Sequence, residues 1–116
     1  MLVNDNLAAL AAHGARTLAA AMTTGAWPAA RNAMIRLFSV RGLHHQAAVR
    51  AQLDGGVALV QLAAHPDLAR QGLVSLWELE LALLLREHPE AEAELRQFVA
   101  EFGPARPGEP HRRCAG

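Results

Sequence analysis

Six histidines are the side chains in this sequence best suited to binding a metal ion. They are His13, His44, His45, His65, His88 and His111. Two ligands share one face of a helix when they are three or four residues apart, and no pair of these histidines has that spacing. The adjacent His44 and His45 would diverge by about 100° on a helix. We therefore expect no metal site.

The single cysteine and the glutamates do not point to catalysis either. Cys114 lies three residues after His111 in a proline-rich segment, whereas a nucleophilic thiol needs a structured base and an oxyanion site. The candidate carboxylates are Glu87, Glu90, Glu92, Glu94 and Glu101. Their spacing is that of the solvated face of an amphipathic helix. We predict a non-enzymatic protein with no catalytic residue and no cofactor.

Charge is unevenly distributed along the chain, although the formal net charge is zero. Residues 1–53 contain five arginines and one acidic residue, whereas residues 73–102 contain seven glutamates and two arginines. These halves can neutralise each other within the fold or across a symmetric interface, and the neutral total argues against general attraction to nucleic acid. Residues 31–50 could still form two helices around a turn at Arg41 and Gly42. A DNA-binding regulator that uses this segment is therefore one alternative.

The composition indicates an all-α protein. Apolar residues make up 52% of the chain, tyrosine is absent, and no segment alternates as a strand would. We predict one domain over residues 1–102, a compact bundle of about five helices, followed by a flexible Pro/Gly-rich tail over 103–116. The apolar surplus suggests that part of the surface faces another chain.

Breaker and capping residues predict the helix boundaries. We expect a first helix from a cap among Asn4, Asp5 and Asn6 to Thr23 and Thr24, then helices over about 28–40, 43–53, 56–64, 65–87 and 90–102. Prolines 28, 66 and 89 suit the first turn of a helix. The pair Gly55 and Gly56 costs about 2 kcal/mol of helix propensity relative to alanine, which predicts a hinge there.

Residues 7–27 are about as long as a membrane span but carry Arg16 near the middle. Placing that arginine at mid-bilayer would cost about 2.5–3.5 kcal/mol, so we expect a helix that packs against other helices. The small residues of one stripe are Ala8, Ala12, Ala15 and Ala19, and the adjoining face holds Leu7, Leu10, Gly14 and Leu18. A membrane-active protein that acts through residues 7–27 is a second alternative.

Residues 73–85 are apolar on nearly all sides, which is typical of a central helix that contacts several neighbours or a second chain. The large side chains of this and the neighbouring helices are the expected packing or interface anchors. They are Trp27, Phe38, Leu76, Trp77, Leu83, Phe98 and Phe102.

Two stretches, AAAMTTGAWPAARNAMIRLF (19–38) and LWELELALLLREHPEAEAELRQFVAEF (76–102), carry a resemblance to known proteins. Together they cover less than half of the chain. They resemble small, uncharacterised, Ala- and Arg-rich all-α proteins of high-GC actinomycetes. This chain departs from their pattern at Pro28, where an acidic residue is more typical. The resemblance implies an all-α fold and transfers no site residue.

We therefore expect a small helical interaction protein, either a homo-oligomer or an adaptor for a larger protein partner. The single cysteine fits a reducing compartment, and the N-terminus lacks the basic region of a signal peptide. The expected location is the cytoplasm.

Overall fold

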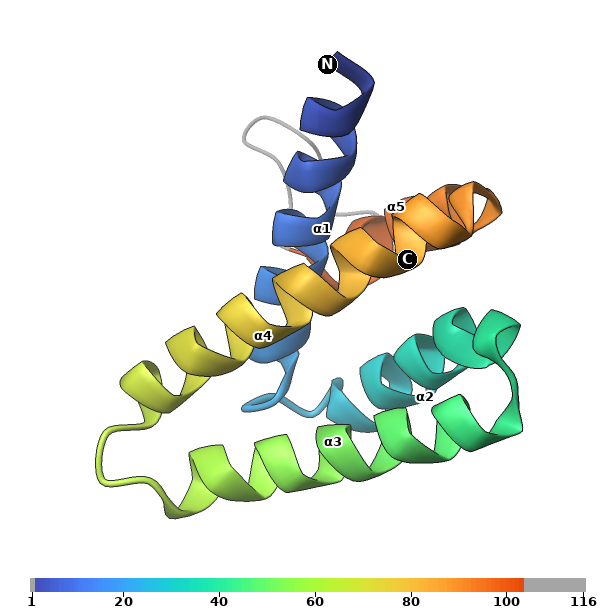
Figure 1. The fold of residues 1–116 in the computed structure, drawn as a ribbon. Helices are drawn as coiled ribbons and strands as arrows, with labels where there is room; N and C mark the ends of the chain where they lie inside the picture. The colour runs from blue at the N-terminus through green and yellow to red at the C-terminus, as the bar shows by residue number, and fades with distance from the viewer. Residues whose placement is uncertain (1, 104–116) are drawn as a thin grey trace, which may run out of the picture.

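The structure, a computed structural model, describes the backbone of residues 2–103 and the side chains of residues 7–103. These residues form five α-helices and two short 3-10 helices, with no strand among them (Figure 1). The elements are α1 (Leu2–Ala21), α2 (Trp27–Leu37), η1 (Phe38–Arg41), α3 (Leu43–Leu62), α4 (Pro66–Glu87), η2 (Pro89–Ala91) and α5 (Glu92–Phe102). The predicted all-α bundle is confirmed. Of the predicted tail, all but Gly103 lies outside the described residues.

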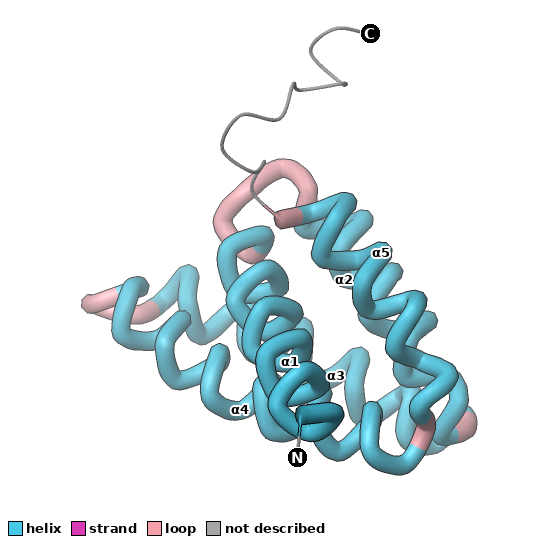
Figure 2. The backbone as a smooth tube through the Cα atoms, turned by 90° about the horizontal axis from the view of Figure 1, so that it is seen from above, coloured by secondary structure: helices cyan, strands magenta, loops and turns pink. Residues whose placement is uncertain are grey.

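The helices pack around α4. Helix α1 packs mainly on α4 and also on α5, whereas α3 packs on η1, α4 and α2. Helices α2 and α5 run side by side, as Figure 2 shows. Helices α3 and α4 diverge from the loop that joins them. This arrangement gives α4 neighbours on two sides.

Aromatic side chains form the centre of the core. Phe38 is fully buried, and its ring meets Trp77 edge to face with the ring centroids 5.9 Å apart. Phe98 is also buried and contacts Phe102 at a centroid distance of 5.1 Å. Trp27 and Phe102 are partly buried against the same core. Five of the seven predicted anchors therefore pack inside the chain.

A close approach at Gly14 positions α1. A Cβ on Gly14 would lie 2.9 Å from a methyl carbon of Leu95 and 3.0 Å from one of Leu81, so a side chain here would force these two leucine side chains to move. The buried face of α1 contains Gly14 and Leu18, whereas Ala8 is exposed. The prediction that the alanine stripe packs against other helices was therefore only partly right, because the adjoining face with Gly14 and Leu18 also makes this contact. That contact is made within the chain.

Two predicted boundaries were wrong. Helix α1 begins at Leu2, before the cap expected at residues 4–6. A helix can start without a side-chain cap because water can satisfy its first N–H groups. The second helix changes to 3-10 geometry after Leu37, and this geometry ends at Arg41, before Gly42, whose φ of 98° favours glycine. Pro28, Pro66 and Pro89 all lie in the first turn of a helix, as predicted.

The hinge predicted at Gly55 and Gly56 is absent, because α3 is continuous. Gly56 is buried, and a Cβ there would touch both methyl carbons of Leu73 at 3.4 Å. Two residues earlier, Arg31 of α2 holds Asp54 through two hydrogen bonds, from Nε to Oδ1 at 2.7 Å and from Nη2 to Oδ2 at 3.1 Å. Tertiary contacts on two sides thus offset the low helix propensity of the glycines.

We predict that Gly14→Val destabilises the protein by about 1–3 kcal/mol, because the branched side chain would be forced against two buried leucines. Urea unfolding followed by circular dichroism measures this change in the free energy of unfolding. Gly55→Val is the matched control, because a Cβ at Gly55 has no atom within 4 Å. It should leave stability unchanged or slightly raised. Equal losses in both variants would contradict the close approach at Gly14.

The Asp54 pair predicts a small dependence of stability on pH. The hydrogen bond from Arg31 lowers the pKa of Asp54, so its stabilisation is complete above the ordinary carboxyl pKa and is lost as pH falls through the lowered value. Because the Asp54 side chain is 54% exposed, Asp54→Asn should cost at most about 1 kcal/mol at pH 7. That cost should shrink progressively below about pH 4. Unfolding curves of the wild type and of Asp54→Asn, recorded over a range of pH, measure it. A difference that grows on acidification would contradict this pairing.

Candidate functional site

An exposed leucine face on α4 is the most distinctive surface of the described residues. Leu68, Leu76, Leu79 and Leu83 are exposed, and Leu79 is 59% accessible to solvent. With Gly72 they recur at i, i+4, i+8, i+11 and i+15, a spacing that keeps them on one side of a helix. We call these five residues the α4 leucine face.

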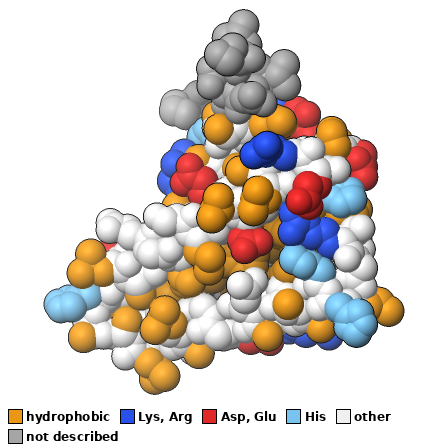
Figure 3. All heavy atoms as spheres, in the orientation of Figure 1, with side chains coloured by type: hydrophobic (Ala, Val, Ile, Leu, Met, Phe, Trp, Pro, Cys, Tyr) orange, Lys and Arg blue, Asp and Glu red, His pale blue; other side chains and the backbone are white. Residues whose placement is uncertain are grey.

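The opposite side of α4 belongs to the core. Leu73, Trp77, Leu81, Leu84 and Leu85 are all buried there. Helix α4 is therefore apolar on two sides, and only one is covered in the described part of the chain. Figure 3 shows hydrophobic side chains over α4 and along α3 on the face turned to the viewer. Leu59 of α3 is another exposed leucine.

Of the predicted anchors, Leu76 and Leu83 lie on the α4 leucine face. Sequence reasoning missed Leu68, Gly72 and Leu79, which share that face. Their spacing in residues 68–83 could have revealed them. It was obscured because buried leucines interleave with the exposed ones along the same helix.

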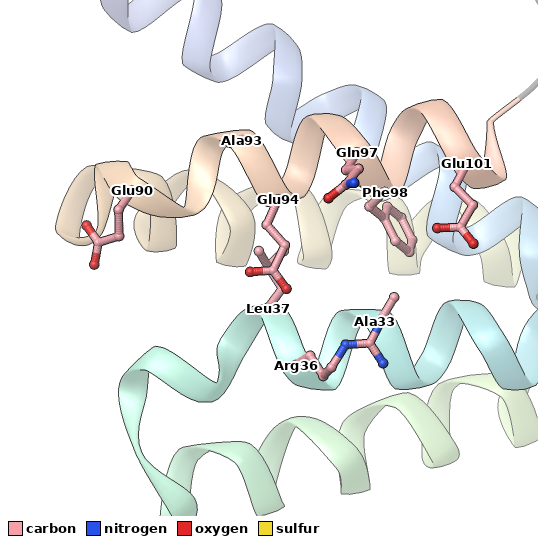
Figure 4. A pocket seen from close by; sticks show the side chains of 9 residues that line it. All are labelled: Ala33, Arg36, Leu37, Glu90, Ala93, Glu94, Gln97, Phe98 and Glu101. Carbon is pink, nitrogen blue, oxygen red and sulfur yellow. The ribbon is translucent and has the colours of Figure 1, made fainter.

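A second candidate is the groove between α2 and α5, with a volume of about 450 Å³. Buried Leu37 and Phe98 point between the two helices, while Arg36 on α2 faces Glu94 and Glu101 on α5 (Figure 4). Its walls therefore combine an apolar base with charges of both signs. These residues did not stand out in the sequence, because each fits the solvated face of its own helix.

Glu90 lies at the far end of the same groove. Its carboxylate is 3.2 Å from Nδ1 of His88. A hydrogen bond from its own backbone N–H, followed by that of His88, holds the pKa of Glu90 below its ordinary value. Glu90 therefore contributes a negative charge to the groove at neutral pH.

Arg41 links the basic and acidic halves of the chain. Its side chain is only 15% exposed, and Nη2 lies 2.9 Å from Oε1 of Glu87. The guanidinium carbon is 5.9 Å from the centre of the Phe38 ring. Nη1 donates to Nε2 of His45 at 3.4 Å, which requires the His45 tautomer that is protonated on Nδ1. The His45 ring in turn stacks on Phe38.

The donors of Arg41 are incompletely satisfied. Nε and Nη2 are buried without a well-aligned hydrogen-bond acceptor, although Nη2 is close to Glu87. Glu87 therefore compensates the buried cation mainly through its charge, because the angle of the contact is poor for a hydrogen bond. The side chain is held by packing on Phe38 as well as by this ion pair.

These contacts weaken the case for DNA binding by residues 31–50. Arg31 and Arg41 are both engaged in ion pairs within the chain. Gln46, which would begin a recognition helix, donates its amide to a backbone carbonyl of α2 at 3.3 Å. His45, in the same segment, is stacked on Phe38 and is therefore also engaged within the chain.

The structure of residues 2–103 adds no evidence for a metal site or for a membrane-spanning helix. There, no group of three or more His, Cys, Asp or Glu side chains is placed to hold a metal ion. None of the helices in that range combines the length and the apolar character that crossing a bilayer requires. His111 and Cys114, which the sequence placed three residues apart, lie outside the described residues.

The Arg41 cluster yields a prediction about stability. Glu87→Ala would leave a buried cation without its counter-charge and should cost about 1–3 kcal/mol. Arg41→Met keeps the apolar contact with Phe38 and removes the unpaired donors, so stability should stay within about 1 kcal/mol of the wild type. Denaturant unfolding of the two variants gives the comparison. A larger loss for Arg41→Met than for Glu87→Ala would contradict this account.

Comparison with known proteins adds no relative. No protein-family model, curated protein or solved structure matches this chain. The two candidate surfaces, the α4 leucine face and the groove between α2 and α5, are therefore judged on the chemistry of their own residues.

Proposed function

We propose that this chain is a non-enzymatic helical interaction protein that associates with a second copy of itself through the α4 leucine face. The observation that carries the proposal is the presence of four exposed leucines on one side of a helix whose other side is already in the core. Contiguous exposed apolar surface of this kind marks interaction sites in soluble proteins.

The energetic reason is the exposed apolar area. Burial of apolar surface contributes about 25 cal/mol per Å², and a fully buried leucine contributes about 1.5–3 kcal/mol. Leu79 and Leu68 are more than half exposed, so the burial of each at an interface would contribute a large part of that free energy. Association must offset the loss of translational and rotational freedom, so flanking contacts are needed as well.

The spacing on the face suits a symmetric pair. Gly72, Leu76, Leu79 and Leu83 follow steps of four, three and four residues, which read the same in both directions. In an antiparallel pair of α4 helices, Leu76 would meet Leu79 of the second copy, and Leu83 would meet Gly72. Within the chain, a Cβ on Gly72 has no atom within 4 Å, so the space above it is open to a partner side chain.

The two alternatives have weaker support. A membrane-active role would require Leu10 and Leu18 of α1 to leave the core that buries them. A DNA-binding role would use a segment whose Arg31 and Arg41 are already paired with acidic side chains. A cytoplasmic location remains the expectation from the single cysteine.

We predict that the wild-type chain has the mass of a dimer in light scattering and that Leu79→Arg shifts it to the mass of a monomer. The arginine would place a charge in the middle of the apolar interface. Leu62→Arg is the matched control, because Leu62 is 86% exposed but belongs to α3 and is not part of the α4 leucine face. This control should retain the dimer mass, and both variants should keep the helical circular dichroism of the wild type.

A monomeric wild-type chain at concentrations up to about 100 µM would rule out self-association of useful strength. A dimer that Leu62→Arg disrupts and Leu79→Arg does not would place the interface elsewhere. A monomer that copurifies stoichiometrically with one larger protein, and loses it on Leu79→Arg, would support the adaptor form of the interaction hypothesis instead.

A further inference from the structure

The α4 leucine face has an apolar neighbour on α3. We propose that the interface between two copies of the chain extends onto α3, where Leu59 forms one wall of a seat above Gly72 that receives Leu83 of the second copy. This inference rests on the proposed self-association and deepens it, because it brings a second helix into the interface. Leu59 is then a residue that sets how tightly the two copies bind.

The α4 leucine face by itself is too small for a stable interface. The exposed fractions of Leu68, Leu76, Leu79 and Leu83 are 63%, 38%, 59% and 37%, which together equal about two fully exposed leucines. Complete burial of one leucine side chain removes on the order of 100 Å² of apolar surface, so the four residues offer about 200 Å². Each partner in an interface of standard size buries about 800 Å². The interface therefore has to extend beyond α4.

Leu59 of α3 is placed for that extension. Leu53, Gly56 and Leu59 are three residues apart, and each step of three turns by about 60° round the helix. Along these steps the chain passes from the fully buried Leu53 to Leu59, which is 54% exposed. Gly56, in the middle, lies against Leu73 of α4. Leu59 is therefore next to the contact between the two helices, on its solvent side, whereas Leu62, one step further, is turned away from α4.

The same steps on α4 lead from the core to the α4 leucine face. Leu73, Leu76 and Leu79 are three residues apart, and their exposed fractions are 8%, 38% and 59%. Because α3 and α4 run in opposite directions, as Figure 1 shows, the same sense of rotation turns both helices toward the same side of the pair. Figure 3 shows hydrophobic side chains over α4 and along α3 on one face of the molecule. Leu59 and the α4 leucine face thus belong to one surface.

Leu59 borders the open space above Gly72. Gly56 lies against Leu73, and the two helices run in opposite directions. Leu59, three residues after Gly56, therefore lies opposite the part of α4 about three residues before Leu73, in the turn that contains Gly72. A Cβ on Gly72 would have no atom within 4 Å. The seat consequently has Gly72 as its floor and Leu59 as its wall on the side of α3.

Symmetry selects Leu83 of the second copy as the occupant of the seat. An antiparallel pair of α4 helices that places Leu76 against Leu79 also places Leu83 over Gly72, because both pairs are centred on the same point of the helix. The two-fold axis repeats the contact, so two equivalent seats each bury one leucine. A large side chain in a fitted pocket is the kind of contact that dominates the affinity of an interface.

Arginine substitutions on α3 test whether this helix takes part. Leu59→Arg should raise the dissociation constant of the dimer about tenfold or more in analytical ultracentrifugation, because it places a charge in the wall of the seat. Ala58→Arg is the matched control, since Ala58 is exposed and lies about 100° round α3 from Leu59. It should change the dissociation constant by less than about threefold. Both variants should keep the helical circular dichroism of the wild type.

Filling the seat tests its position. Gly72→Leu should raise the dissociation constant about tenfold or more, because the new side chain takes the place of Leu83. It should not lower the free energy of unfolding of the monomer, since the space within the chain is open. Gln71→Leu is the matched control on the next exposed position and should have less than about a threefold effect. Adding Leu83→Ala to Gly72→Leu moves the leucine across the same contact and should restore the dissociation constant to within about threefold of the wild type.

The outcomes separate this inference from the proposed function. A wild-type dimer that Leu79→Arg dissociates, but that Leu59→Arg and Gly72→Leu leave intact, would overturn the inference and leave the proposed function standing. Equal weakening by Leu59→Arg and Ala58→Arg would also overturn it, because the effect would not come from the side of α3 next to α4. If the double variant with Leu83→Ala regained no affinity, Leu83 would not be the occupant of the seat. A monomeric wild-type chain would overturn both proposals.

Discussion

The rest of the structure depends on the close packing of α1 against α4 and α5 at Gly14. A side chain there would meet methyl groups of Leu81 and Leu95 at about 3 Å, so the absence of a side chain lets these leucines pack directly against the backbone of α1. Once α1 occupies that side of α4, Trp77 is left to meet Phe38 on the other. No further helix within residues 2–103 covers the remaining side of α4. The exposed leucines are a consequence of this arrangement.

Ion pairs connect the elements around this core. Arg31 joins α2 to α3 through Asp54, and Arg41 joins η1 to α4 through Glu87. The basic and acidic halves of the sequence therefore neutralise each other partly within one chain. The exposed Arg31 to Asp54 pair adds little stability by itself. Both pairs occupy arginines that a nucleic-acid interface would need to be free.

Some charges are left over by this internal pairing. Arg36 and Glu94 face the groove between α2 and α5 and are not joined to each other in an ion pair closer than 4 Å. Two surfaces thus remain for interactions, one apolar on α4 and one charged between α2 and α5. They differ in the salt dependence expected for anything that binds them.

The sequence by itself determined the helical class and the prolines that lie in the first turns of three helices. These are local properties, decided by propensity and by residues within one turn. Only the tertiary structure decided that α3 runs unbroken through Gly56 and which leucines of α4 are exposed. Both depend on residues far apart in the chain, such as Leu73 beside Gly56, and periodicity within one helix cannot specify them.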